Sequence, residues 1–351
     1  MTTSPKISII VPIYNMTAYL RECLDAIVGQ TFHDWECLLV NDGSTDDSGA
    51  ICDEYAKRDP RFKVIHRENG GVSAARNSGL KASSGQHISF IDPDDVPHTR
   101  LMERLLALIE EFDADVAEVS YESFFSTFRS RKQLVETTTV LNRGEMALEL
   151  LYSRKVPSYM WNKLFRHEIV DTPFLEGIVF EDVMVMSKWL RNIRKIVISP
   201  EILYSYRQRK GSIVHTHSVQ NRLQHLQAMF SLTESLHELE PTVVTEKIAN
   251  KTKWKSIIRS AKYIARFEKD AKVRHEGVGK IRKIANEIPL PDIKVGTKLY
   301  LRSRLLCNCP KLFIALMRLT TKFDFHKHYR ARHEFTPGQK GQHITGESPK
   351  A

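Results

Sequence analysis

The sequence is poor in the features that mark several common classes of protein. It has five cysteines in 351 residues, and no two of them form a C-x-x-C pair, which excludes a zinc ribbon and a thioredoxin-type redox site. It has neither a G-x-x-x-x-G-K-[ST] loop nor a G-x-G-x-x-G run, so a Walker A ATPase and an NAD-binding domain are disfavoured. No apolar run reaches the roughly 20 residues needed to cross a bilayer.

The first residues and the cysteine spacing indicate the compartment. Residues Met1–Pro5 are polar and lead directly into a strand-like run, so we expect no signal peptide. The odd number of scattered cysteines does not suggest a disulfide framework. Both observations favour a cytoplasmic protein.

Charge is distributed unevenly along the chain. A hydrophobic content of 42%, a charged content of 27% and a mean hydropathy of −0.33 are typical of a soluble globular protein. The net charge of +10 divides into −6 over residues 1–250 and +16 over residues 251–351. We therefore expect an acidic body and a basic tail with different partners.

Apolar and amphipathic stretches alternate over the first 120 residues. This alternation is typical of βαβ units, and it predicts an α/β fold with a mostly parallel sheet. The predicted strands are Ile7–Ile13, Glu36–Val40, Phe62–Ile65, His87–Ile91 and Asp115–Val119. The predicted helices are Thr17–Gln30 (with Thr17 as the cap), a segment ending near Arg58, Val72–Lys81 and Arg100–Phe112. Further along, Arg143–Tyr152, Val183–Leu190 and residues 218–288 are predicted to be mainly helical, and Lys195–Ile198 and Ile202–Tyr206 to be short strands.

Four polar clusters each follow one of the first four predicted strands. They are Pro12–Asn15, Asn41–Ser44, Arg67–Gly71 and Asp92–Asp95. The carboxyl ends of parallel strands lie at the same edge of a sheet, where ligands of open α/β folds bind. We therefore expect the four clusters to meet at one rim.

The acidic cluster Asp92–Asp95 predicts a divalent cation site. Three carboxylates within four residues repel one another unless a cation or hydrogen-bond donors hold them, and Mg²⁺ and Mn²⁺ prefer such oxygen ligands. The alternative is an acidic turn that caps the next helix.

The other clusters suggest groups that bind a nucleotide. At the rim, Asp42 could accept a ring N–H from uracil, thymine or guanine, or it could serve only in a turn and helix cap. Tyr14 could stack on the base or pack at the edge of the sheet. The glycines before Val72 open a helix that could bind an anion, and Arg76 could reach a diphosphate or the acidic cluster; its alternative is an ion pair on the helix surface.

In this order and spacing, the motifs resemble the nucleotide-sugar half of glycosyltransferase family 2, which has the GT-A fold. The matching stretches are residues 9–15 (IIVPIYN), 40–46 (VNDGSTD), 69–77 (NGGVSAARN) and 90–95 (FIDPDD). The resemblance implies that Pro12, Tyr14 and Asp42 hold the base, that Asn69 and Arg76 line the nucleotide site, that Asp92 contacts ribose or metal, and that Asp94 binds Mn²⁺ or Mg²⁺. Pro93 stands where family members often have Ser. It removes a backbone donor but leaves both carboxylates in place.

A second pair of stretches resembles the subgroup that modifies bacterial surface polymers. These are residues 160–165 (MWNKLF) and 180–183 (FEDV). The resemblance makes Asp182 the general base, with Glu181 as the substitute, and it gives Trp161 a place as an apolar platform for the acceptor sugar. Taken from the residues alone, the Glu-Asp pair could be a helix cap favoured by the helix dipole, and Trp161 could belong to the core.

The segment at residues 206–213 (YRQRKGSI) resembles the part of this subgroup that closes over the diphosphate. Arg207 or Arg209 would neutralise phosphate charge, and His215 is a candidate for a further metal ligand. The alternative is a solvated basic loop.

The resemblance implies a metal-dependent inverting glycosyltransferase. A sugar, either a hexose or an N-acetylhexosamine, would pass from a nucleoside diphosphate donor, with UDP the expected nucleotide, to a hydroxyl of a surface polysaccharide, a lipid-linked glycan or a cell-wall polymer. Two other functions stay open. One is a nucleotidyltransferase, although the loop after the first strand lacks the expected Gly-rich basic run. The other is a non-enzymatic basic module that senses nucleotides.

The expected organisation has three parts. Residues 1–217 would form the GT-A domain, with residues 6–120 as its nucleotide-sugar half and 121–217 as its acceptor half. Residues 218–330 would form a helical basic extension, and residues 331–351 a disordered tail.

The basic extension has more than one possible partner. Leucines and phenylalanine alternate with arginine and lysine between residues 301 and 322, which suits two interfacial helices hinged at Pro310 on an anionic membrane, at the inner face of the plasma membrane. A nucleic-acid partner is disfavoured because no named motif is present. A helical subdomain that forms a homo-oligomer through the same apolar face is the remaining alternative.

Overall fold

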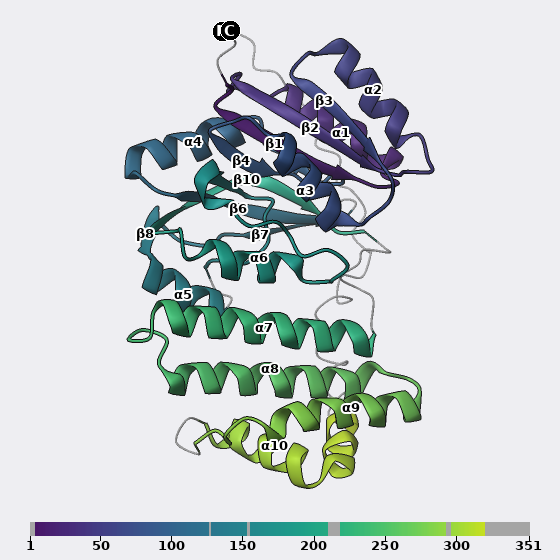
Figure 1. Ribbon diagram of the computed structural model, residues 1–351, viewed down its shortest axis with the longest axis vertical. Helices are drawn as coiled ribbons and strands as arrows, with labels where there is room; N and C mark the ends of the chain where they lie inside the picture. The colour runs from purple at the N-terminus through teal and green to yellow at the C-terminus, as the bar shows by residue number, and fades with distance from the viewer. Residues whose placement is uncertain (1–3, 126–127, 153–154, 210–217, 293–295, 320–351) are drawn as a thin grey trace, which may run out of the picture.

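The computed structural model describes residues 4–125, 128–152, 155–209, 218–292 and 296–319. A ten-stranded sheet with flanking helices forms its first part, and a stack of helices forms its second (Figure 1). The strands are β1 (Ile7–Ile13), β2 (Trp35–Asp42), β3 (Phe62–Arg67), β4 (His87–Phe90), β5 (Val96–Pro97), β6 (Val116–Phe125), β7 (Phe128–Lys132), β8 (Thr139–Asn142), β9 (Lys163–Arg166) and β10 (Lys195–Arg207). The helices are α1 (Thr17–Val28), α2 (Ser48–Arg58), α3 (Val72–Ala82), α4 (Leu101–Phe112), α5 (Arg143–Tyr152), the 3₁₀ turn His167–Ile169, α6 (Glu181–Trp189), α7 (Val219–Leu239), α8 (Glu246–Phe267), α9 (Ala271–Asn286) and α10 (Thr297–Asn308).

The strand order confirms the predicted α/β class. The main path runs β3-β2-β1-β4-β9-β6-β10-β5, and β7 and β8 pair with β6 and β10. Pairing is parallel among β1, β2, β3 and β4, so the loops after these four strands leave the sheet at one edge. Beyond β4 the pairing is mostly antiparallel, with β6 and β10 parallel to each other.

Several predicted boundaries differ from the structure. The two short strands predicted between residues 195 and 206 are one strand, β10, with register shifts between Ser199 and Tyr204 that bend it. Helix α6 begins at Glu181, two residues earlier than predicted. Thr17 is the first helical residue rather than the cap, and its N–H donates to Asp46 from the neighbouring loop. Strand β9 has no clear sequence signal because a strand of four residues is too short to show an alternating pattern.

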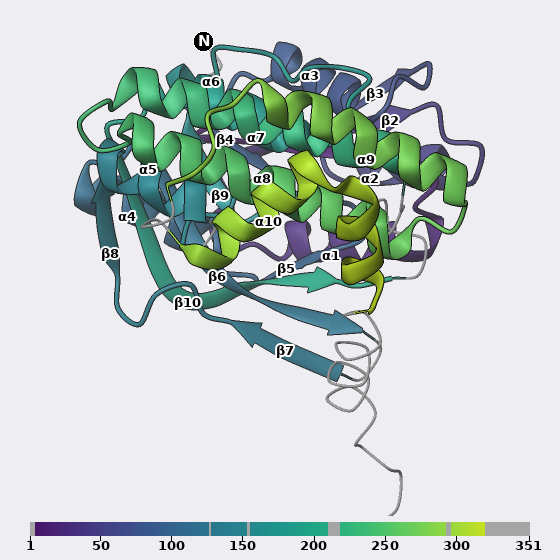
Figure 2. The same cartoon turned by 90° about the horizontal axis from the view of Figure 1, so that it is seen from below.

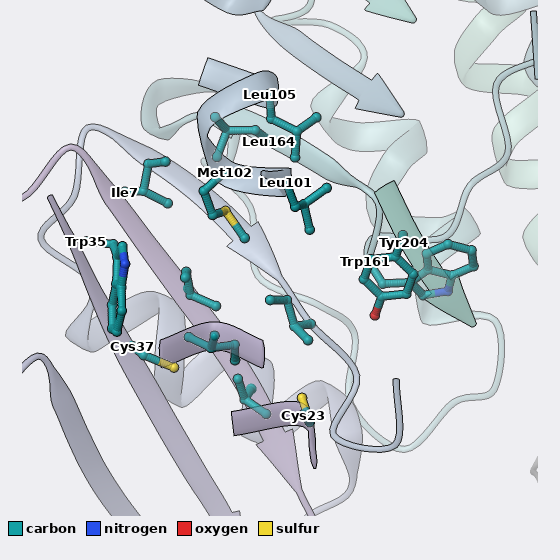
Figure 3. Close-up of a cluster of buried hydrophobic side chains, with 14 of the residues drawn as sticks. Ile7, Cys23, Trp35, Cys37, Leu101, Met102, Leu105, Trp161, Leu164 and Tyr204 are labelled. Atoms are coloured by element: carbon teal, nitrogen blue, oxygen red, sulfur yellow. The ribbon is translucent and has the colours of Figure 1, made fainter. Parts of the chain in front are cut away.

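Alternation along the strands gives the sheet two apolar faces. In β1, Ile9 and Val11 pack with α1, α2 and α4 in one cluster, whereas Ile10 joins Phe90, Trp189 and Leu232 in the cluster on the other face. Figure 3 shows part of the first cluster, including Trp35, Met102 and Leu164. Every residue of β1 and β2 is buried, as expected for strands covered on both faces.

Helix α7 belongs to two cores at once. Its Ala228, Leu232 and Leu236 lie in the second sheet cluster, whereas its Leu226 lies in a third cluster with Trp254 and residues of α8, α9 and α10. Figure 1 shows α7, α8, α9 and α10 stacked below α5 and α6, which lie between them and the sheet, and Figure 2 shows this stack from below. The helical extension is therefore packed onto the α/β body rather than tethered to it, and the boundary at residue 217 stays a prediction.

The last described helices are amphipathic in the way the sequence predicts. Residues 310–319 are helical and follow α10. Leu306 and Phe313 are buried in the third cluster, while Leu301, Leu312 and Leu319 are more than half exposed. Among the described residues, no helix combines the length and the apolar character needed to cross a membrane.

Candidate active site

The loops after β1 and β2 are joined by hydrogen bonds. Asn15, in the left-handed conformation (φ +53°), receives the Thr45 N–H on its side-chain oxygen at 2.8 Å and donates its own N–H to the Ser44 hydroxyl at 3.1 Å. These bonds hold the neighbouring Tyr14 at the rim, where its side chain is 45% exposed. An exposed ring on a fixed loop is suited to stacking on a base.

Asp42 fastens the third loop to the second. Its buried carboxylate accepts the N–H groups of Gly70 at 3.1 Å and Gly71 at 2.7 Å, and Arg67 Nε lies 3.1 Å away. The Asn69 side chain donates to the Asp42 carbonyl at 3.0 Å. These contacts leave at least one of the roughly four acceptor positions of the Asp42 carboxylate open to a ligand.

These contacts bring the predicted rim residues together. Pro12 is buried in β1 opposite Val40, at the end of the strand that leads to Tyr14. The roles of Pro12, Tyr14, Asp42 and Asn69 toward a base stay predictions.

Arg76 connects the acidic turn to the start of α6. It lies in α3, is 6% exposed, and donates to Glu181 at 2.7 Å and to Asp92 at 3.3 Å. The sequence left an ion pair on the helix surface as the alternative for Arg76, whereas the structure shows a buried bridge. Its two partners, Asp92 and Glu181, lie 16 and 105 positions further along the chain. Gly71 and Arg76 are five residues apart, about 7.5 Å of helix, so α3 links the Asp42 loop to the Asp92 turn.

The turn after β4 is anchored by Asp95. This fully buried carboxylate accepts the Tyr204 hydroxyl at 2.9 Å and the Arg207 N–H at 2.7 Å. Burial, together with the charges of Asp92 and Asp94, raises the pKa of Asp95 well above its ordinary value. Asp95 therefore fixes the turn, which leaves Asp92 and Asp94 as the carboxylates available to a ligand.

Arg207 and Arg209, which the resemblance places over the diphosphate, both contact the acidic turn. Arg209 Nε donates to the Asp94 carboxylate at 2.6 Å, and Arg207 Nε donates to the Asp94 carbonyl at 2.7 Å. Arg207 also pairs with Glu22 at 2.5 Å. Both arginines are thus placed beside the acidic turn rather than in a solvated loop, and phosphate binding by them stays a prediction.

The predicted metal site rests on Asp92 and Asp94. Burial, and then the neighbouring Asp94 charge, raise the pKa of Asp92 although Arg76 opposes this effect. No group of three or more His, Cys, Asp or Glu side chains in the described parts of the chain is arranged to hold a metal. His215 lies outside the described residues. Two carboxylates fit an ion that draws its other ligands from substrate phosphates and water, as Mg²⁺ does.

Asp182 lies in the first turn of α6. Phe180, the residue before the helix, has φ +72°, which turns the chain sharply into α6. One carboxylate oxygen of Asp182 accepts the Val183 N–H at 2.8 Å and the other accepts the Ser158 hydroxyl at 3.2 Å. Burial and the adjacent Glu181 raise the pKa of Asp182 to about 6, which suits a general base working near neutral pH.

Trp161 lies in an aromatic stack. Its ring is stacked on Tyr159 at 4.3 Å, on Tyr204 at 4.6 Å and on Tyr206 at 5.3 Å, and only 6% of Trp161 is exposed. Figure 3 shows Trp161 beside Tyr204. With its faces occupied, the ring has little surface to offer a sugar. The structure favours the core position that the sequence left open, and it argues against the acceptor platform.

Two supporting features were missed from the sequence. Lys163 and Glu118 form a fully buried ion pair at 2.9 Å, completed by Asn162. Ser158 contacts Asp182 from a loop without a distinctive pattern. Asn162 and Lys163 lie in the stretch 160–165 that carries the resemblance, but the sequence does not indicate either pairing, because each depends on a partner more than 20 residues away.

Comparison with known proteins identifies the class. The family model "Glycosyl transferase family 2" matches residues 8–172. EpsJ of Bacillus subtilis, described as an uncharacterized glycosyltransferase, is 35% identical over 64% of this chain and 68% of its own length. The minor teichoic acid biosynthesis protein GgaB of B. subtilis is 28% identical over 83% of this chain and 33% of its own length.

A solved structure shares the fold. S. aureus TarS 1–349, crystallised with UDP-GlcNAc, superposes with a TM-score of 0.69 at 19% identity over 92% of both chains. The fold and the sequence relatives together define a glycosyltransferase, which sets aside the nucleotidyltransferase and the non-enzymatic module. The chain belongs to glycosyltransferase family 2 and has the GT-A fold.

Proposed function

We propose that this protein is an inverting glycosyltransferase that moves a sugar from a nucleoside diphosphate, UDP, to an acceptor hydroxyl activated by Asp182. The observation that carries the proposal is the Arg76 bridge. One guanidinium binds Asp92 of the turn after β4 and Glu181 beside Asp182. The nucleotide end and the proposed base therefore lie on either side of a single side chain.

The two ends have complementary tasks in a single displacement. At the nucleotide end, Tyr14 stacks on the base, Asp42 accepts its ring N–H, and Arg207 and Arg209 face the diphosphate. At the other end, Asp182 takes the proton from the acceptor hydroxyl as that oxygen attacks the anomeric carbon. Attack from the face opposite the leaving diphosphate inverts the configuration.

The cofactor we propose is Mn²⁺ or Mg²⁺, held by Asp94 and Asp92. Asp92 and Asp94 lie two residues apart in the acidic turn, and each is paired with one guanidinium group, Asp92 with Arg76 and Asp94 with Arg209. A diphosphate would bring further negative charge to this turn, which a bound cation would balance. When bound, the ion would stabilise charge on the leaving diphosphate.

The acceptor we propose is a surface polysaccharide, a lipid-linked glycan or a cell-wall polymer. The similarity to GgaB, whose name places it in teichoic acid biosynthesis, supports this class.

We also propose that the protein binds the anionic inner surface of the plasma membrane through its last described helices. Leu312, Leu316 and Leu319 are exposed at spacings of four and three residues, so they form one apolar row. Lys311 and Arg318 are exposed beside this row. An apolar row flanked by cations is the pattern of an interfacial helix, and it favours the membrane over a homo-oligomer.

A donor screen tests the proposed function. The purified protein is incubated with UDP-, GDP- and dTDP-sugars, with and without Mn²⁺, and released nucleoside diphosphate is measured. We expect release from a UDP-sugar that depends on the metal. Release from none of the donors, with or without a cell-wall acceptor, contradicts the proposal.

A further inference from the structure

A cavity of about 500 Å³ opens beside Asp182, between the α/β body and the helices that follow it. Its walls come from α5, the start of α6, α7 and α8, which are neighbours in Figure 1. None of the described residues that line it lies in β1–β4 or in the loops after those strands. The cavity therefore adjoins the proposed base but is separate from the loops assigned to the nucleotide, and its volume suits a small ligand or one unit of a polymer.

The end of the cavity at α6 contains the proposed base. Asp182 and Ser158 both line it, and their hydrogen bond at 3.2 Å lies at its wall. A hydroxyl in this end of the cavity would meet the Asp182 carboxylate. Phe180 and His225, whose ring centroids are 4.7 Å apart, form the wall between α6 and α7.

One face of α8 forms the opposite wall. Thr252, Lys255, Ser256 and Arg259 all line the cavity, and their spacing of three, four and seven residues places them on one side of the helix. From the first to the last of them, the helix rises about 10 Å. Thr252 and Ser256 are buried, whereas Lys255 and Arg259 are exposed, so the hydroxyls lie deep and the cations lie toward solvent.

Two polar atoms in the cavity wall lack a hydrogen-bond partner among the described residues. They are Thr252 Oγ1, in a side chain that is 3% exposed, and His225 Nδ1. Buried polar atoms in folded proteins nearly always have a partner. Such atoms in the wall of a cavity are therefore best explained by a polar ligand that supplies one.

The charges at the two ends of the cavity are opposite. Asp182 gives the α6 end negative charge, and Lys255 and Arg259 give the α8 wall positive charge. Burial together with the charges of Arg259 and Arg222 lowers the pKa of His225, which lies between them, to about 4. Arg259 forms no ion pair with any carboxylate in the described parts of the chain, although it lines the cavity.

We infer that this cavity is the acceptor site, and that Arg259, supported by Lys255, binds a phosphate group of the acceptor while the acceptor hydroxyl lies at Asp182. The inference rests on the proposed function and adds to it: the acceptor is a phosphate-bearing polyol or sugar, and the helical extension, not only the α/β body, selects it. The buried hydroxyls of α8 and the unpartnered His225 nitrogen lie between the two ends.

Binding of two defined oligomers tests this inference. Tri(glycerol phosphate) and its neutral analogue triglycerol are titrated into the full-length protein, with UDP and Mn²⁺ saturating the nucleotide site. We expect the phosphate oligomer to bind at least tenfold more tightly. Arg259→Gln should weaken its binding about tenfold through loss of a charge-assisted contact, whereas Arg259→Lys should recover most of it.

Lys247→Gln provides the matched control. It removes one exposed cation from the same helix, outside the cavity, and should bind like the unchanged protein. Equal binding of both oligomers, binding of neither, or equal behaviour of Arg259→Gln and Lys247→Gln overturns the inference. Failure of the donor screen would instead contradict the proposed function, because oligomer binding is measured without turnover.

Discussion

The α/β body and the helical extension differ in how clearly the sequence reveals their candidate functional residues. In the body, the groups that matter follow strand ends and lie in short motifs, and the loops are fastened by contacts such as Asp42 with Gly71. In the extension, the cavity residues Thr252 and Arg259 have no motif, only a helical spacing that many surface helices share. Under the proposed function, the body would bind the donor, and the extension would distinguish one acceptor from another.

The two regions share a hydrophobic core as well as the cavity. Helix α7 shares one core with the sheet through Leu232 and another with α8 and α9 through Leu226. His225 lies on the same helix and lines the cavity. A change in acceptor preference is therefore expected to require changes on α7 and α8, with the strand-end loops retained.

The largest effect expected in the body is on catalysis. Asp182→Asn removes the proton acceptor while keeping the shape of the side chain, so turnover should fall by about 10²–10⁴-fold. Binding of UDP, measured by titration calorimetry, should persist because Asp182 is not among the rim residues. Near-normal turnover would remove Asp182 from the role of base and weaken the division between the two ends.

A smaller effect is expected at the acidic turn. Asp94→Ala should abolish the part of donor binding that depends on Mn²⁺, about tenfold or more in affinity, since a charged ligand of the ion is lost. The measurement is donor affinity with and without the metal. Asp47→Ala, which removes an exposed carboxylate in the loop before α2, serves as the control. Unchanged metal dependence in Asp94→Ala would take Asp94 out of the site.

The extension is expected to supply membrane affinity that the body lacks. Replacing Leu312, Leu316 and Leu319 together by Ser should reduce sedimentation with anionic vesicles about tenfold or more, because three apolar contacts with the bilayer are lost. Folding should be unaffected because these side chains are exposed. Leu175→Ser with Leu290→Ser, at exposed leucines elsewhere, is the control. Equal binding of the two variants, or no binding of the unchanged protein at low salt, contradicts membrane docking.

The smallest effect expected is on the pH dependence of folding stability, which the raised pKa of Asp182 predicts. The pKa of Asp182 is raised to about 6 by burial and Glu181, while Arg76, Val183 and Ser158 oppose the rise; Lys163 and His225 are the other titratable groups near it. A raised carboxyl pKa means that the folded state binds the proton more tightly. The contribution of Asp182 to stability therefore falls as pH rises from about 4 to about 6.

Asp182→Asn should consequently make the protein more stable at pH 8 by about 1–2 kcal/mol, after allowance for partial solvent access. The gain should shrink as the pH is lowered toward 4. Chemical denaturation at pH 8 and pH 5 measures it. The activity of the unchanged enzyme should also fall about tenfold per pH unit below 6, since only the ionised carboxylate accepts a proton. Equal stability of the two proteins at pH 8 would show that burial of Asp182 has no energetic cost.

Much of the fold could be predicted where local pattern and global structure agree. The strand Ile7–Ile13 is found with the predicted bounds, and α5 over Arg143–Tyr152 likewise, because a β-branched run or an amphipathic period decides each locally. Strand β10 could not be predicted as one element, since its bend at Ser199 and its pairing with β6, β8 and β5 depend on residues far away in the sequence.

The candidate site also has features that the sequence predicts and features that only the structure shows. The sequence by itself determined which residues follow the parallel strands and hence that Tyr14, Asp42 and Asp92–Asp95 share a rim, because strand direction and side-chain chemistry are local properties. Only the tertiary structure decided that Arg76 bridges Asp92 and Glu181, that Trp161 is enclosed by tyrosines, and that α8 faces Asp182 across a cavity. Each of these depends on contacts between residues far apart in the sequence, such as the 105 positions between Arg76 and Glu181, or on how completely neighbours exclude water, and no short stretch of the chain encodes either property.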